Sequence, residues 1–335
     1  MRERGIRWFA PLIALLLVGG SLLGWLGIRS PAPSALSPIV HLDAQTQCIV
    51  TPDGRARELV VGDIDSAQKS VLVECYLISD PSIVGALQSA RKRGCDVRVI
   101  MEEKPFGGFS MNQTVRNQLR SSGIDANWGN RVYAFTHAKF LVIDGSVAWL
   151  MTANLSKSAF DKNREVLVRT DNTAVAGDLS RLFWADRRRN ACGAGSLVVS
   201  PVNARESLVA LLRRSTGTID IASEVFDDPE VSRVLQELAR SGRRIRVLAA
   251  TPDKIAVNAV TRSELNGTGV AMRYLETPYL HAKYIVVDGK SAYIGSNNLS
   301  AGSLDENREA GLITDSRPII DVLEATFAAD WANAR

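Results

Sequence analysis

The stretch HAKFLVIDGSVAWLMTANLSKSAFDKNREVLV, residues 137–168, recurs as HAKYIVVDGKSAYIGSNNLSAGSLDENREAGL at residues 281–312. The two copies align without gaps at a constant offset of 144 residues, and 14 of the 32 positions are identical. The polar residues that they share include His137 and His281, Lys139 and Lys283, Asp144 and Asp288, Asn154 and Asn298, and Glu165 and Glu309. An internal repeat defines the units of a fold. We therefore expect one structural unit that occurs twice.

The repeat extends upstream of these copies. Residues 71–100 align with residues 219–248, and Asp80-Pro81 then lies over Asp228-Pro229. Apolar β-branched runs predict strands at 71–78, 97–101, 219–226 and 245–250, and amphipathic or closing segments predict helices at 82–93, 173–189, 230–241 and 318–333. Each motif block also contains two apolar runs joined by a glycine-containing turn, as in a β-hairpin. Strands that alternate with helices predict an α/β fold, in which helices cover a sheet.

We place the two copies at residues 45–190 and 196–333. Two-fold packing is the commonest association of like units, so we expect the copies to pack as a pseudo-two-fold dimer within one chain. Such packing would bring both motif blocks to a shared interface. The protein would then be a monomer that contains an internal pseudo-dimer.

The repeated residues offer hydrogen-bond donors beside an imidazole. Alternate residues of a strand point to the same face, so His137 and Lys139 would lie side by side, with Asn154 within reach after the returning strand. Ammonium and carboxamide donors suit the oxygens of a phosphoryl group. The second half repeats this set as His281, Lys283 and Asn298.

Two imidazoles that face each other across a phosphodiester suit double displacement at phosphorus. One neutral histidine would attack the phosphorus, and the other, protonated, would donate to the leaving oxygen. The sequence indicates no metal site and no cofactor, because no third histidine or acidic cluster accompanies the motifs. Glu165 and Glu309 each follow the histidine of their own half by 28 residues. A carboxylate that accepts the Nδ1 proton would fix the histidine tautomer.

The pattern HxKxxxxD, followed six residues later by GSxN, resembles the signature of the phospholipase D superfamily. The second half matches it throughout, with His281, Lys283, Asp288 and the run Gly295-Ser296-Asn297-Asn298. The first half departs from it only at Met151-Thr152, which replaces Gly-Ser. Thr152 keeps the hydroxyl that Ser296 has, whereas the bulkier Met151 is expected to reshape one wall of the site.

The resemblance covers both halves and implies a fold and a reaction. It implies two phospholipase D-like α-β-α sandwiches and metal-independent cleavage or transfer of a phosphodiester through a phosphohistidine intermediate. It implies His137 as the nucleophile and His281 as the acid and base, although the internal symmetry leaves the reverse order open. The lysines and asparagines of the motifs would hold the phosphoryl charge. Asp144 and Asp288 are expected to support the motif turns.

The N-terminal sequence is typical of a targeting segment. Trp8–Ile28 is an uncharged, mostly apolar run of 21 residues preceded by three arginines, long enough to cross a bilayer core of about 30 Å. We expect residues 1–30 to be a membrane anchor or, alternatively, a cleaved signal peptide, with a buried helix as the third interpretation. Residues 31–44 would be a linker. The rest of the chain would then lie outside the cytoplasm, in the periplasm or at the cell surface.

Composition limits the substrate. The chain has 335 residues, 46% of them hydrophobic, and a formal net charge of +4, of which the first thirty residues supply +3. Residues 31–335 are thus close to neutral, which disfavours a strongly basic nucleic-acid binder. We expect a phospholipid substrate at a membrane surface. An extracytoplasmic nuclease that uses the same site, and a non-catalytic module, are the alternatives. Trp128 and Trp149 are expected to pack in the core or, alternatively, to form a wall for an acyl chain.

Overall fold

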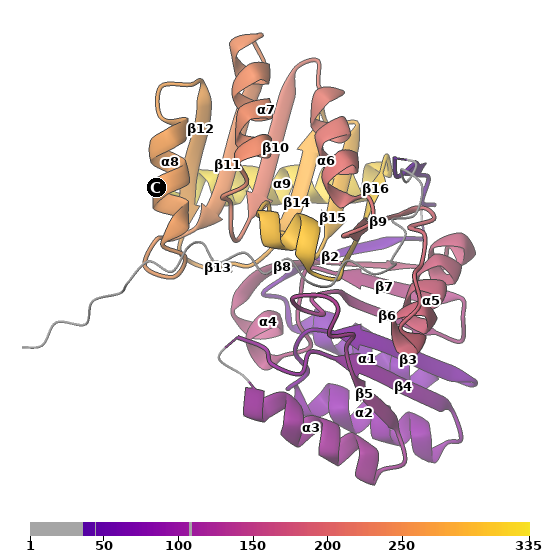
Figure 1. Ribbon diagram of the computed structural model, residues 1–335. Helices are drawn as coiled ribbons and strands as arrows, with labels where there is room; N and C mark the ends of the chain where they lie inside the picture. Colours follow the sequence, from indigo (N-terminus) through magenta and orange to yellow (C-terminus); the bar gives the residue numbers. More distant parts are fainter. Residues whose placement is uncertain (1–35, 44, 107–108) are drawn as a thin grey trace, which may run out of the picture. The chain divides into compact units, whose positions relative to one another are not determined.

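The computed structural model describes residues 36–43, 45–106 and 109–335. Within this part the chain forms two eight-stranded sheets with helices packed against them (Figure 1). The strand order in one sheet is β13-β8-β7-β6-β3-β4-β5, with β2 paired to β8, and in the other it is β1-β16-β15-β14-β10-β11-β12, with β9 paired to β16. The mixed α/β class predicted from the sequence is therefore confirmed.

The first half supplies the elements from β2 to α5. Its strands are β2 (Gln47–Thr51), β3 (Ser70–Cys75), β4 (Asp96–Met101), β5 (Asp125–Trp128), β6 (Lys139–Ile143), β7 (Val147–Met151) and β8 (Asn163–Thr170). Its helices are α1 (Gly54–Ser66), α2 (Pro81–Lys92), α3 (Phe109–Ser121), α4 (Lys157–Asp161) and α5 (Thr173–Arg188).

The second half repeats this order. Its strands are β9 (Leu197–Ser200), β10 (Thr218–Ser223), β11 (Arg244–Ala250), β12 (Val270–Leu275), β13 (Tyr279–Leu280), β14 (Lys283–Val287), β15 (Ser291–Gly295) and β16 (Glu309–Thr314). Its helices are α6 (Ala204–Arg213), α7 (Pro229–Arg240), α8 (Val257–Leu265), the π-helical turn η1 (Gly302–Glu306) and α9 (Arg317–Asn333).

The Asp-Pro pairs of the repeat begin equivalent helices. Asp80 caps α2, because its Oδ1 accepts hydrogen bonds from the backbone N–H groups of Ser82, at 2.9 Å, and Ile83. Asp228 caps α7 in the same way through the N–H of Val231, at 2.9 Å. In both helices proline occupies the first turn, where its missing N–H leaves no helical bond unmade.

The motif aspartates hold the hairpin turns. Asp144 and Asp288 both have positive φ angles, of 52° and 53°, and each is followed by a glycine. The Asp144 carboxylate accepts hydrogen bonds from the backbone N–H groups of residues 68–70, at 2.7–2.9 Å. The Asp288 carboxylate accepts three from residues 216–218, over the same range. Each aspartate thus ties the β6–β7 or β14–β15 hairpin to the loop that precedes the central strand β3 or β10.

Short segments of each half pair with the sheet of the other half. β13, which ends directly before His281, pairs in parallel with β8 of the first half. The equivalent segment of the first half forms a single bridge between Thr136 and Arg308. Residues Ile39–Val40 form β1, which pairs with β16 of the second half. The predicted linker over 31–44 is therefore wrong at these two residues, which belong to a sheet.

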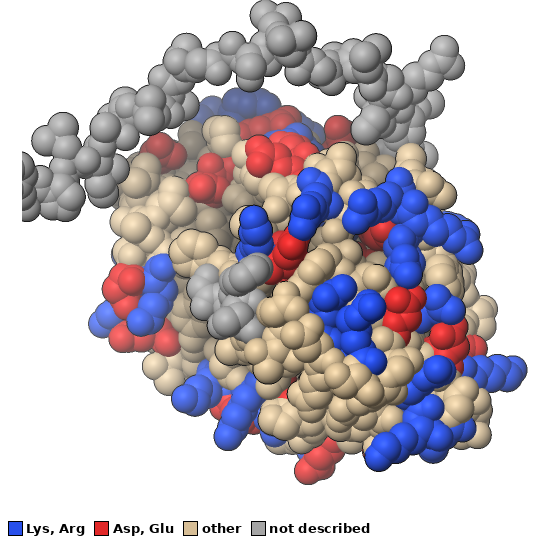
Figure 2. All heavy atoms as spheres, turned by 60° about the horizontal axis from the view of Figure 1, so that its bottom comes forward, with Lys and Arg blue, Asp and Glu red and all other residues tan. Residues whose placement is uncertain are grey.

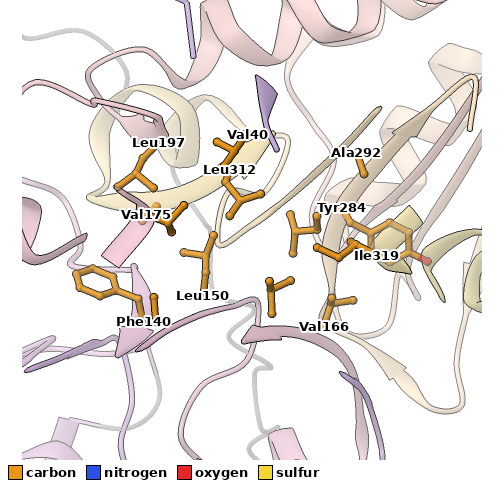
Figure 3. Close-up of a cluster of buried hydrophobic side chains, with 14 of the residues drawn as sticks. Val40, Phe140, Leu150, Val166, Val175, Leu197, Tyr284, Ala292, Leu312 and Ile319 are labelled. Atoms are coloured by element: carbon orange, nitrogen blue, oxygen red, sulfur yellow. The ribbon is translucent and has the colours of Figure 1, made fainter. Parts of the chain in front are cut away.

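One hydrophobic cluster joins the two halves. It contains side chains from β6, β7 and β8 of the first sheet, from β14, β15 and β16 of the second, and from α5 and α9. Figure 3 shows Phe140, Leu150 and Val166 in this cluster together with Tyr284 and Leu312. Each half also has a separate core on the opposite face of its sheet, against helices such as α2 and α7. Each sheet is thus buried on both faces, which accounts for its continuous apolar strands.

The expected anchor over residues 1–30 lies outside the described residues. In the part of the chain that the structure describes, no helix combines the length and apolar character needed to cross a bilayer.

We predict that Asp288→Asn destabilises the protein in a pH-dependent way. Burial raises the pKa of Asp288, but its backbone hydrogen bonds outweigh burial and lower the pKa from 3.8 to about 2. Asparagine tolerates the positive φ but loses the charge, so we expect a loss of roughly 2 kcal/mol near neutral pH. The pKa is lower in the folded state than in the unfolded state, so the contribution is complete above about pH 4 and disappears towards pH 2. Urea denaturation at several pH values measures it. A constant difference between the two proteins from pH 7 to pH 2 would contradict the argument.

Candidate active site

Backbone hydrogen bonds between the halves fix both motif histidines. The N–H of His137 donates to the carbonyl of Arg308, at 2.8 Å, and the N–H of His281 donates to the carbonyl of Arg164, at 3.1 Å. Each arginine directly precedes the glutamate of its motif block. The glutamate of one half is therefore placed beside the histidine of the other half.

The histidine–glutamate pairs are exchanged between the halves. Nδ1 of His137 lies 2.8 Å from Oε2 of Glu309, and Nδ1 of His281 lies 2.7 Å from Oε1 of Glu165. The sequence spacing suggested that each glutamate would orient the histidine of its own half, and this interpretation is wrong. The physical reason is the exchanged backbone pairing, which carries each histidine across to the neighbouring sheet. Because Nδ1 is engaged in both rings, Nε2 is the nitrogen left for chemistry.

A second set of exchanged contacts reinforces the first. Arg164 forms a bidentate ion pair with Asp330, at 2.7 and 2.9 Å, and the buried Arg308 contacts Asp186 at 2.9 Å. Asp330 belongs to α9 and Asp186 to α5, the closing helices of the opposite halves. Arg308 also bonds the hydroxyl of Tyr133. The segments that carry the catalytic candidates are thus anchored by side chains as well as by backbone.

The two glutamates are fully buried and remain acidic. The hydroxyl of Thr152 donates to Glu165, at 2.6 Å, and that of Ser303 donates to Glu309, at 2.5 Å. Burial raises the pKa of Glu309, but the charge and hydrogen bond of His137 outweigh it, and the resulting pKa is below the usual value. The pKa of Glu165 is lowered in the same way against burial. Ser296 exchanges hydrogen bonds with the backbone of Ala310, so it supports the strand that carries Glu309.

Burial makes His137 a weak base. It lowers the pKa of His137 from 6.5 to about 4; Glu309 opposes this shift, and the positive charges of Lys139 and Lys283 add to it. His137 is therefore neutral at neutral pH, with a free Nε2. A neutral imidazole is the form that can attack an electrophile.

The motif lysines and asparagines lie on the same elements as their histidines. Lys139 and Lys283 are buried, and each donates to the backbone carbonyl of the histidine two residues before it. Burial lowers the pKa of Lys139 from 10.5 to about 8, so it is largely cationic at neutral pH. Oδ1 of Asn298 accepts from the N–H of Val225, at 3.1 Å, whereas the buried Oδ1 of Asn154 has no hydrogen-bond partner among the described residues.

One carboxylate of the site was missed from the sequence. Glu224 follows β10, and its Oε2 lies 2.9 Å from Nζ of Lys283 and 3.4 Å from Nε2 of His281. Tyr76 is the aligned residue of the first half, and its ring lies 4.7 Å from that of His137. The alignment of the upstream segments could have revealed Glu224. It pairs Glu224 with Tyr76, and a tyrosine and a glutamate are too different in chemistry to fill the same role.

The expectation about Met151 is wrong, whereas the expected core packing of Trp149 is confirmed. Met151 is fully buried in the core of the first half and forms no wall of the site. Its counterpart is Gly295, where a Cβ atom would collide with the hydroxyl of Tyr293 and with the backbone of Gly311 and Ala310. Trp149 is also fully buried, with Nε1 donating to Asp63 at 2.8 Å, so it is a core residue and offers no surface to an acyl chain. Trp128 is partly buried beneath the guanidinium of Arg116.

Among the residues that the structure describes, no three His, Cys, Asp or Glu side chains form a group that could hold a metal ion.

Comparison with known proteins agrees with this arrangement. The family model described as "Cardiolipin synthase, PLD-like domain" matches residues 60–187 and 208–331. Cardiolipin synthase A of Pseudomonas putida (strain W619) is 25% identical over 334 aligned positions, which cover 87% of this chain and 70% of the relative.

Two solved structures share the fold. Phosphatidylserine synthase from Haemophilus influenzae Rd KW20 superposes with a TM-score of 0.69 at 12% identity, over 89% of this chain and 88% of the other. Polyphosphate kinase from Porphyromonas gingivalis gives a TM-score of 0.64 at 22% identity, over 84% of this chain and half of the kinase. At these identities the likeness concerns the fold alone.

The family model covers most of both halves, and the two matched ranges contain both motif blocks. The prediction of an enzyme of phospholipase D type is thereby confirmed, and the chain belongs to the phospholipase D superfamily.

Proposed function

We propose that the protein is a metal-independent phosphodiesterase of phospholipase D type that cleaves or transfers the phosphodiester of phospholipids. The observation that carries this proposal is the pair of imidazoles, each held at Nδ1 by a buried carboxylate from the other half, 2.7–2.8 Å away. A carboxylate at Nδ1 fixes the tautomer and leaves Nε2 for proton transfer or attack. The relatives named as cardiolipin synthases support a phospholipid as substrate.

The first step would form a phosphohistidine. The lone pair on Nε2 of His137 attacks phosphorus in line, an N–P bond forms, and the bond from phosphorus to the leaving alcohol breaks. The alcohol oxygen takes a proton from Nε2 of His281. In the second step water or another alcohol gives its proton to His281 and attacks phosphorus, and the N–P bond breaks.

The contacts support this division of roles. Burial lowers the pKa of His137 to about 4, which keeps it neutral. Two carboxylate oxygens flank the ring of His281, with Oε1 of Glu165 2.7 Å from Nδ1 and Oε2 of Glu224 3.4 Å from Nε2. His137 therefore suits the nucleophile and His281 the proton donor. Lys139, Lys283 and the two motif asparagines would hold the phosphoryl oxygens.

A lipid substrate is favoured over a nucleic acid. Figure 2 shows one face of the molecule, where Lys and Arg side chains are interspersed with Asp, Glu and uncharged residues. Nucleic-acid binding draws most of its affinity from many phosphate contacts and needs a stronger excess of positive charge. We also propose an extracytoplasmic location, on the strength of the apolar run over residues 8–28 and its arginine flank. A monomer suffices for catalysis, because both halves of the site come from one chain.

We predict that His137→Ala and His281→Ala each abolish turnover, whereas EDTA leaves the wild-type rate unchanged. The assay uses phospholipid vesicles with a little ethanol, and mass spectrometry detects phosphatidic acid and phosphatidylethanol. Transfer to ethanol reports a covalent intermediate that partitions between two acceptors. Loss of activity in EDTA would contradict the metal-free reaction. If labelled DNA or RNA is cut while the lipid is not, the protein is a nuclease instead.

We predict a bell-shaped dependence of kcat/KM on pH. The acid limb follows protonation of His137, near pH 4, and Lys139 loses its charge above about pH 8, which weakens the hold on the phosphoryl oxygens. Glu309 raises the pKa of His137, so Glu309→Gln should move the acid limb to lower pH. The same change should reduce the rate about tenfold or more, because the ring loses its orientation. Glu230→Gln, on the surface of α7, is the matched control. An acid limb that does not move in Glu309→Gln would show that Glu309 does not act through His137.

A further inference from the structure

The surroundings of the two reactive nitrogens differ. On the side of His137, the ring of Tyr76 packs edge-on against the imidazole and also against Phe135, with ring centres 4.7 and 5.9 Å apart. In the repeat alignment the residues equivalent to Tyr76 and Phe135 are Glu224 and Tyr279. One side of the site is therefore aromatic and the other acidic.

Glu224 is held rigidly as a carboxylate. Its Oε1 accepts a hydrogen bond from the hydroxyl of Tyr279, at 2.7 Å, and its Oε2 accepts one from Lys283, at 2.9 Å. Only 13% of its side chain is exposed. Burial raises the pKa of Glu224, but the positive charges of His281 and Lys283 outweigh burial and bring the pKa far below its usual value. Glu224 is thus ionised, and this charge is not part of the nucleophile or of the exchanged histidine–glutamate pairs.

The charge of Glu224 restricts which group of the substrate can lie beside it. Lys283 donates to Glu224, at 2.9 Å, and to the carbonyl of His281, which leaves one of its N–H bonds for a phosphoryl oxygen. The phosphoryl oxygens are negative, so repulsion directs them away from Glu224 and towards Lys139. The atom that must approach Nε2 of His281 is the oxygen of the alcohol that leaves or attacks. Since Oε2 of Glu224 lies 3.4 Å from that nitrogen, the alcohol, and not the phosphate, is the group that faces Glu224.

We propose that Glu224 and Tyr279 form an alcohol subsite in which Glu224 is a specificity-determining residue. The subsite selects alcohols that carry a second hydrogen-bond donor, a hydroxyl or an N–H, on the carbon next to the one that bears the reacting oxygen. The reacting oxygen forms a hydrogen bond with Nε2 of His281, and the neighbouring group donates a hydrogen bond to the Glu224 carboxylate. This second hydrogen bond is strong because its acceptor is ionised. This inference rests on the proposed function.

Transfer to such an alcohol balances with the groups present. The reacting hydroxyl gives its proton to Nε2 of His281, its oxygen forms the new P–O bond, and the N–P bond to His137 breaks. The second donor keeps its proton throughout, so Glu224 undergoes no net chemical change. Tyr279 acts as a positioning residue, because its hydroxyl holds the other carboxylate oxygen.

The test is a competition between two acceptors that differ only in the second donor. The full chain in detergent micelles with phosphatidylglycerol receives equal concentrations of ethylene glycol and 2-methoxyethanol, in which a methyl group replaces one hydroxyl hydrogen. Mass spectrometry measures the ratio of the two phosphatidyl products. This ratio is internal to each reaction, so changes in overall rate cancel.

Wild-type protein should favour ethylene glycol, and Glu224→Leu should reduce the product ratio at least about tenfold, which corresponds to ~1.4 kcal/mol. Glu224→Gln keeps the side-chain volume and one acceptor oxygen, so it should give an intermediate product ratio. It also keeps the test decisive if the leucine variant does not fold. Tyr279→Phe should lower the ratio less than Glu224→Leu, and Glu230→Gln should leave it as in the wild type.

Two outcomes would overturn the subsite. One is a wild-type enzyme that transfers to both acceptors without preference, and the other is a ratio that stays unchanged in both Glu224 variants while transfer continues. An equal loss of transfer and hydrolysis in Glu224→Gln, with the ratio unchanged, would assign Glu224 to the support of His281 and Lys283. If the wild type forms no phosphatidyl product and no phosphatidic acid, the proposed function itself fails and the subsite with it.

Discussion

The exchange of histidine–glutamate pairs between the two halves is the constraint on which the site depends. Neither half contains a complete catalytic unit, because the carboxylate that orients its histidine comes from the other half, 2.7–2.8 Å away. A buried glutamate without its partner would be an unpaired charge, which costs several kcal/mol. The polar site and the packing of the halves therefore stabilise one another. The apolar cluster shared by β6, β7, β14 and β15 brings the halves together, and the buried ion pairs fix how they meet.

The near-symmetry of the fold and the proposed asymmetry of the chemistry have separate structural origins. The exchanged contacts occur twice at equivalent positions, as His137 with Glu309 and His281 with Glu165. The surroundings of the two histidines differ at one pair of aligned positions, where Tyr76 lies beside His137 and Glu224 lies beside His281. The proposed double displacement needs one histidine as nucleophile and the other as proton donor. A duplicated chain can specialise its two histidines by changing a single neighbour of each, which two identical subunits cannot do.

The repeat in the sequence predicted much of this, because identical spacing carries both fold and chemistry. It placed two strands and two helices of each half to within a few residues, the hairpins at Asp144 and Asp288, and the residue types of the site. It could not predict which glutamate meets which histidine, since spacing along one chain does not report an exchange between two sheets. Met151 was misjudged because a residue next to a motif can point to either face of its strand. Glu224 was missed because it lies outside the motif, more than fifty residues before His281.

The strand β1 affects the order in which the molecule can be completed during synthesis. Val40 and its partner Thr314 are 274 residues apart in the chain, so a segment synthesised before the first half pairs with a strand synthesised late in the second half. The edge of β16 that receives β1 does not exist until the second half has emerged. During translation Ile39 and Val40 therefore have no strand partner until β16 has been synthesised. The pairing of β1 with β16 therefore follows the synthesis of both halves, and it joins a segment that precedes the first half to the strand that carries Glu309.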